Sequence, residues 1–110
     1  MLDLRLYMLQ RITALLMAPL VVGHIAVMIY AVRGGLSAAE IFGRTQGSVA
    51  WFAFYGLFVV AVSVHGAIGL RVIAHEWGGL RGGALEALMW VVGLGLLGLG
   101  AQAVWAVTYG

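Results

Sequence analysis

Two of the three histidines in this sequence, His24 and His65, lie inside long apolar stretches. An ionisable side chain within a membrane helix is costly and marks a functional site by default. Because no charged residue stands beside either histidine, both rings should be neutral, and each can offer a ring nitrogen to a metal. A zinc site needs three or four ligands, whereas a haem needs one axial ligand from each of two helices. The pair therefore indicates haem, and the alternative is that the rings form hydrogen bonds between helices.

The distances of the two histidines from nearby arginines bear on whether they share one haem. At about 1.5 Å rise per helical residue, His24 lies roughly 20 Å from Arg11, and His65 lies roughly 9 Å from Arg71. If those arginines mark similar heights, the histidines differ in depth by about 11 Å, which is too far for both to bind one iron. We therefore expect each histidine to need a partner histidine from another chain, in a hetero-oligomer or a homodimer that could hold two stacked haems.

Polar and aromatic residues gather where the first apolar stretch begins and where the second one ends. Hydrogen-bond donors, a proton-exchanging His/Glu pair and an aromatic wall suit a quinone head group, whose reduction consumes protons. The alternative is an ordinary interface belt in which long charged side chains reach the headgroups. Arg11 and Arg71 could also pair with haem propionates, because arginine binds carboxylates in a bidentate manner. The residues of this group are Gln10, Arg11, Thr13, Arg71, His75, Glu76 and Trp77.

The composition determines which solvent surrounds these residues. Of the 110 residues, 64% are hydrophobic and 9% are charged, whereas a soluble domain carries about 25% charged residues. A chain this short buries only part of its surface, so the surrounding solvent must be lipid. The absence of cysteine excludes disulfides, iron–sulfur ligation and thiolate metal sites in this chain. A net charge of +2 with no basic cluster gives no sign of a nucleic-acid partner.

Three apolar stretches, at about residues 10–32, 49–74 and 84–109, are long enough to position these side chains within a membrane. About 20 residues cross the hydrocarbon core as a helix. We therefore predict an all-α integral membrane protein with three transmembrane helices in one unit over residues 1–110. The first stretch has no cleavage-like site, which predicts a retained helix rather than a signal peptide. Ser37 predicts the start of a short interfacial helix, and HEWGGLRGG, residues 75–83, predicts a tight loop.

The placement of arginines predicts the orientation, because basic residues of membrane proteins are enriched on the cytoplasmic side. Four arginines fall on the side of the N-terminus and the HEWGG sequence, and two fall on the other side. The N-terminus and that loop should therefore be cytoplasmic, and the C-terminus should lie outside. The two groups are Arg5, Arg11, Arg71 and Arg81, and Arg33 and Arg44.

Glycines accompany His65 and recur in the third stretch. Gly66 and Gly69 lie close to His65 in the sequence and would leave room for a flat porphyrin. The glycines of the third stretch favour close helix packing, which small residues permit in membranes. The alternative is that a cofactor presses against them. These glycines are Gly93, Gly95, Gly98 and Gly100.

Two segments, LQRITALLMAPL from Leu9 and HGAIGLRVIAHEW from His65, resemble the small membrane-anchor subunits (cytochrome b or hydrophobic anchor) of succinate dehydrogenase and fumarate reductase. In that family the second helix carries a haem-ligating histidine followed by a glycine. Further along it carries an acidic residue beside an aromatic one at the quinone site. The matching residues are His65, Gly69, Glu76 and Trp77. The usual acidic and aromatic pair is Asp-Tyr, and here it is Glu-Trp. His24 is similar to the first-helix ligand of two-haem members.

The resemblance implies a four-subunit complex of the respiratory chain and the tricarboxylic acid cycle in a bacterial cytoplasmic membrane. A flavoprotein would oxidise succinate, an iron–sulfur subunit would relay electrons, and two anchor subunits would bind quinone and share one or two haems b. This chain would then bind no dicarboxylate itself. Three alternatives stay open: an anchor of a quinol:fumarate reductase working in the reverse direction, a cofactor-free structural anchor, and a small transporter or channel subunit with the histidines as a proton relay.

Overall fold

The computed structural model describes residues 4–110, and over these residues the chain forms four helices and no strand. Residues 1–3, where the expected cytoplasmic N-terminus begins, lie outside the described part. Three helices are long and apolar enough to cross a membrane, which confirms the prediction of a three-helix integral membrane protein. The fourth is short and lies between the first two long ones. The helices are α1 (Leu4–Gly34), α2 (Ala38–Thr45), α3 (Val49–Gly78) and α4 (Gly82–Thr108).

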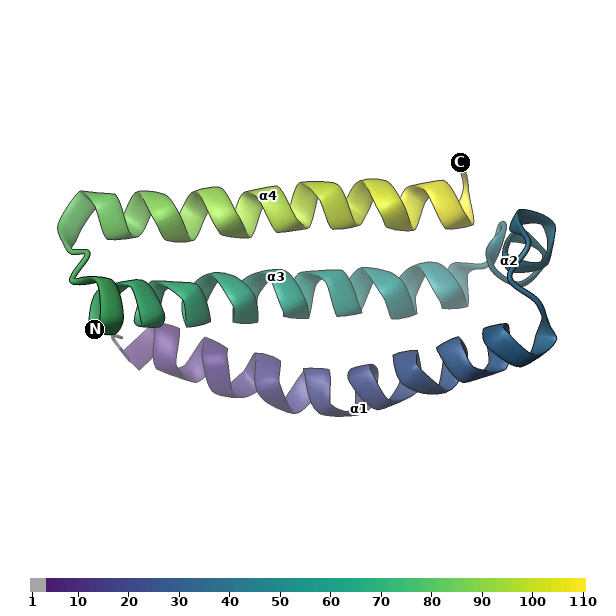
Figure 1. Cartoon of the computed structure of the whole chain (residues 1–110), viewed down its shortest axis with the longest axis horizontal. Coiled ribbons are helices and arrows are strands. Elements are labelled where there is room, and N and C mark those ends of the chain that lie inside the picture. The colour runs from purple at the N-terminus through teal and green to yellow at the C-terminus, as the bar shows by residue number, and fades with distance from the viewer. Residues whose placement is uncertain (1–3) are drawn as a thin grey trace.

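α3 is the central helix, and α1 and α4 pack on opposite sides of it (Figure 1). The three long helices run antiparallel in sequence order, so the start of α1 lies at the same end as the turn between α3 and α4. α2 and the C-terminus lie at the other end (Figure 1). α1 curves along its length and contains Pro19, which cannot donate a backbone hydrogen bond within the helix. Side chains on α3 can therefore contact both neighbouring helices.

The end of α3 lies further along the chain than the sequence indicated. The structure continues the helix through His75 and Trp77 to Gly78, so only residues 79–81 form the turn. Gly79 has a φ of +70°, a left-handed conformation that glycine adopts without steric cost. Its N–H donates to the His75 carbonyl, and the Leu80 N–H donates to the Ala74 carbonyl. Such bonds around a left-handed residue are a common way of ending a helix. The expectation that the tight loop begins at His75 is therefore wrong.

α2 begins as the sequence predicts. The Ser37 Oγ accepts a hydrogen bond from the Glu40 N–H at 3.2 Å, and the Glu40 carboxylate accepts one from the Ser37 N–H at 3.4 Å. This reciprocal capping box satisfies donors at the start of the helix. At the other end of α2, the Thr45 hydroxyl donates to the Val107 carbonyl at 2.5 Å, and the Gly47 N–H donates to the Thr108 carbonyl at 2.5 Å. These bonds occupy carbonyls at the end of α4 that have no partner within that helix.

The four glycines in the middle of α4, at positions 93, 95, 98 and 100, divide into two pairs. A Cβ added at Gly100 would overlap the Val59 side chain, and one added at Gly93 would lie 3.2 Å from the Ala67 Cβ. These two glycines therefore allow α4 to approach α3 closely, which confirms the packing expectation for them. A Cβ added at Gly95 or Gly98 would have nothing within 4 Å in the described structure.

The G100A substitution should therefore destabilise the contact between α3 and α4. The added methyl group would have to displace Val59, whose branched side chain has little freedom to move, and such overpacking costs about 1–3 kcal/mol. The matched variant is G98A, on the same helix with open space around it. Unfolding of the purified protein in detergent should show a lower midpoint for G100A than for G98A. Equal midpoints would contradict this account of the contact.

Candidate functional site

His65 lies in the middle of α3 and contacts α1 through Thr13. Its Nδ1 is 3.2 Å from the Thr13 Oγ1. The Thr13 hydroxyl lies 2.7 Å from the Leu9 carbonyl one turn earlier and donates its only proton there. With its proton assigned to the Leu9 carbonyl, the hydroxyl accepts from His65. This assignment puts the ring proton on Nδ1 and the lone pair on Nε2.

The Nε2 of His65 has no hydrogen-bond partner among the described residues. The buried side-chain nitrogen and oxygen atoms that lack a partner in the described structure are Gln10 Oε1 and Arg71 Nε. The His65 side chain as a whole is half-buried. A neutral imidazole with Nδ1–H bonded and Nε2 free is the form in which histidine binds a metal.

His24 lies in the other half of α1, in aromatic surroundings. Its ring centroid is 5.1 Å from that of Phe58 and 6.3 Å from that of Tyr55, both on α3. The ring also lines a largely apolar groove of about 580 Å³, to which α2, α3 and α4 contribute. Cofactor and ligand pockets typically measure about 300–1,000 Å³. His24 was expected from the sequence as a site residue, but its aromatic neighbours were not. They follow Trp51 in an aromatic-rich part of α3.

The two histidines lie at different depths along the bundle. His65 is level with Thr13 on α1, because the two are hydrogen bonded. Thr13 and His24 are separated along α1 by about 16 Å at 1.5 Å per residue. One iron cannot bridge that separation, as the spacing from the arginines indicated. The chain therefore offers two separate imidazole positions.

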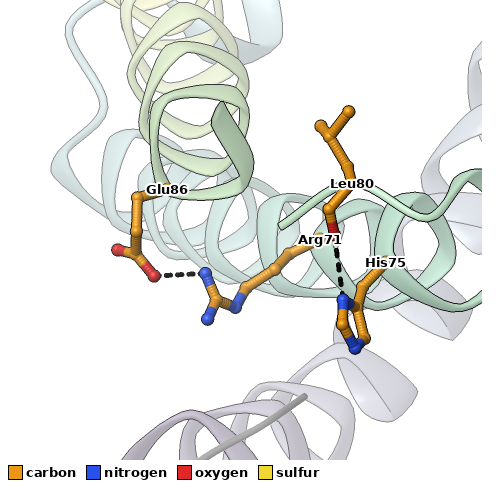
Figure 2. A network of polar contacts seen from close by, with 4 residues as sticks. All are labelled: Arg71, His75, Leu80 and Glu86. Carbon is orange, nitrogen blue, oxygen red and sulfur yellow. Dashed lines mark hydrogen bonds and ion pairs between the residues drawn. The ribbon is translucent and has the colours of Figure 1, made fainter. Parts of the chain in front are cut away.

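Arg71 on α3 forms an ion pair with Glu86 on α4 (Figure 2). The Arg71 side chain is 13% exposed and that of Glu86 is 51% exposed. Arg71 was predicted as a contact for haem propionates or quinone, and in this chain its guanidinium already has a carboxylate partner. This ion pair was not among the contacts expected from the sequence. The available signal was the acidic Glu86 in the third apolar stretch, on the helix antiparallel to that of Arg71.

His75 stabilises the turn between α3 and α4. Its Nδ1 is 2.9 Å from the Leu80 carbonyl oxygen, to which the ring donates (Figure 2). The other ring nitrogen has no partner among the described residues. Glu76 and Trp77, which follow on the same helix, are exposed, and Trp77 is 87% exposed.

The structure does not bring the predicted quinone residues of α1 and α3 to one depth. Thr13 is level with His65 and only 6% exposed, whereas His75 lies about 15 Å further along α3. Arg11 is exposed, with its guanidinium 5.8 Å from the centre of the Tyr7 ring. The expectation that these residues meet is wrong because Thr13 packs inward against the middle of α3.

The fold and these side chains define a class of protein: a three-span membrane subunit with two imidazoles in its spans and a polar cluster at one end. A family model described as the succinate dehydrogenase/fumarate reductase transmembrane subunit matches residues 2–101. The chain therefore belongs to this family, as the resemblance predicted, and is a membrane subunit of such a multi-subunit complex. Comparisons with curated proteins and with solved structures returned no match.

The ion pair between Arg71 and Glu86 predicts coupled effects on stability. E86Q should destabilise the protein by about 1 kcal/mol, since half of the glutamate is exposed and solvent weakens the pair. R71Q combined with E86Q should cost less than the sum of the two single substitutions. E76Q, which changes a carboxylate that has no ion-pair partner in the described structure, is the control. Additive costs in a double-mutant cycle would show that Arg71 does not depend on Glu86.

Proposed function

We propose that this chain is the haem b- and quinone-binding membrane anchor of a succinate:quinone oxidoreductase in a bacterial cytoplasmic membrane. It passes electrons between the iron–sulfur subunit and quinone. The observation that carries this proposal is the 3.2 Å contact between the His65 Nδ1 and the Thr13 hydroxyl, which leaves Nε2 without a hydrogen-bond partner among the described residues. Such an imidazole in the central span is ready to bind iron without any change of tautomer.

Both half-buried imidazoles fit the requirements of a haem ligand. His65 offers a free Nε2, and His24 has no hydrogen-bond partner among the described residues and lines an apolar groove. A bound haem b would supply a centre that accepts and releases one electron at a time. Because the two histidines are at different depths, each haem would take its second histidine from the other anchor subunit. The apolar side chains around His24 would keep water away from the iron.

Arg11 is the better of the two candidates for a haem propionate. Its guanidinium is exposed and contacts the face of Tyr7, which leaves its donors free for a bidentate carboxylate. Arg71 already pairs with Glu86, although its buried Nε remains without a partner. Arg71 would therefore bind a propionate only alongside the carboxylate of Glu86.

The quinone head group would bind near the end of α3, with His75, Glu76 and Trp77 as its contacts. Arg11 lies two residues from Thr13 on α1, nearer the depth of His65, and stays a candidate for a haem propionate only. The Nε2 of His75 is free because Nδ1 already donates to Leu80. His75 and Glu76 lie next to each other at the membrane surface, where either can exchange a proton with water. The indole N–H of Trp77 can donate to a quinone carbonyl. Thr13 is buried against His65 and bonds to that ring, so it is not a quinone contact in this proposal.

A second function has one observation in its favour. A hydrogen bond between Thr13 and His65 is also what a cofactor-free structural anchor would use to join α1 to α3. The same residues would serve equally well in a quinol:fumarate reductase, because the direction of electron flow depends on the relative potentials of the partners.

Removing the imidazole of His65 tests haem ligation. In the purified complex, H65A should lose one haem b, measured as pyridine haemochrome per complex and as a reduced-minus-oxidised spectrum. H24A should remove a second haem if there are two. The control is H75A, which changes a histidine on the same helix that bonds to the Leu80 carbonyl, and it should retain all haem. Full haem content in H65A, or a colourless active complex, would support the structural anchor.

Substitutions at the end of α3 test the quinone site. W77L and E76Q should raise the KM for quinone while leaving haem content unchanged, because both side chains are exposed and far from His65. The control W105L changes an exposed tryptophan at the opposite end of the bundle. Steady-state quinone reduction by the complex gives the comparison. Similar KM values for W77L and W105L would count against a site at this end.

A further inference from the structure

We propose that Thr13 is a positioning residue for His65. Its hydroxyl accepts the Nδ1 proton, which determines the nitrogen that His65 presents to a ligand and makes that nitrogen a stronger donor. The inference deepens the proposed function and depends on it, since it concerns how His65 holds a haem.

The direction of the hydrogen bond follows from the proton inventory of the Thr13 side chain. A threonine hydroxyl has one proton and can accept additional bonds. We assign that proton to the Leu9 carbonyl, the nearest acceptor at 2.7 Å, with the Gln10 carbonyl second at 3.1 Å. Only an acceptor site remains for His65 at 3.2 Å. The result is a series of two hydrogen bonds, in which the His65 ring donates to Thr13 and Thr13 donates to the α1 backbone.

The residues around Thr13 hold this series of hydrogen bonds in place. Thr13 is 6% exposed, so no solvent competes for its oxygen, and hydrogen bonds in series in a low-dielectric interior strengthen one another. The branched side chain of threonine also restricts rotation about χ1. One turn away, the Gln10 amide lies against Gly69, where an added Cβ would be 3.5 Å from the Gln10 Nε2. That distance is an ordinary van der Waals contact, so Gln10 adds a second contact between α1 and α3 one turn from Thr13.

The bond should affect the iron through the imidazole. Donation from Nδ1–H raises the basicity of the opposite ring nitrogen. A more basic ligand stabilises the oxidised iron over the reduced iron and so lowers the reduction potential. Without the Thr13 hydroxyl, the potential of the haem on His65 should rise and its binding should weaken, by about 10- to 100-fold for a typical partner of this kind.

The test compares T13V with T13S in the purified complex. Valine keeps the shape of threonine and removes the hydroxyl, whereas serine keeps the hydroxyl. Redox titration of the haem b absorbance should give a higher midpoint potential for T13V, and haem should dissociate from it more readily. T13S should keep the potential close to that of the wild type. The matched control is T108V, which removes a buried hydroxyl that likewise donates to the carbonyl four residues earlier but lies at the far end of α4. It should leave the potential unchanged.

Two results would overturn the role of Thr13. One is an unchanged potential and unchanged haem retention in T13V. The other is a shift or loss of haem in T13S as large as that in T13V, because the hydroxyl would then not be the feature that matters. Either result leaves the proposed function intact, provided that H65A removes a haem. A wild-type complex without haem would instead overturn the proposed function itself.

Discussion

The hydrocarbon core of a membrane offers no hydrogen-bond partner to a polar side chain, and the contacts of the central helix answer that constraint. On one side of α3, His65 meets the Thr13 hydroxyl, and on the other side Arg71 meets the carboxylate of Glu86. Each contact joins α3 to a different neighbour. The polar side chains that could do chemistry therefore also connect the three spans to one another.

The same constraint applies to the polar atoms of the spans that have no hydrogen-bond partner within the described part of this chain. Nε2 of His65 and the whole ring of His24 have no hydrogen-bond partner among the described residues. A polar atom without a partner is unfavourable in lipid, and a ligand or a partner subunit would meet the need for one. The chain has this need at two depths, because the imidazoles are separated along the bundle. Membership of a family of multi-subunit complexes agrees with that need.

The exposed surface of the spans leads to the same conclusion from apolar side chains. Large hydrophobic residues cover all three long helices, including Leu15, Ile73 and Val91. Gly95 and Gly98 on α4 leave open space around them. A bundle in which α1 and α4 contact mainly α3 buries few side chains, so lipid and the other subunits of the complex must cover the rest.

The sequence by itself determined the features that depend on composition or on neighbouring residues. These are the three spans, the start of α2 at Ser37, and the depth difference between the histidines, which follows from residue counts at a fixed helical rise. Only the tertiary structure decided that Thr13 faces His65. The physical reason is that these spans are apolar on every side, so no pattern along the chain marks which face of one helix meets its neighbour. The end of α3 was equally undecided, because four glycines follow Trp77 closely and only the left-handed conformation of Gly79 shows where the helix stops.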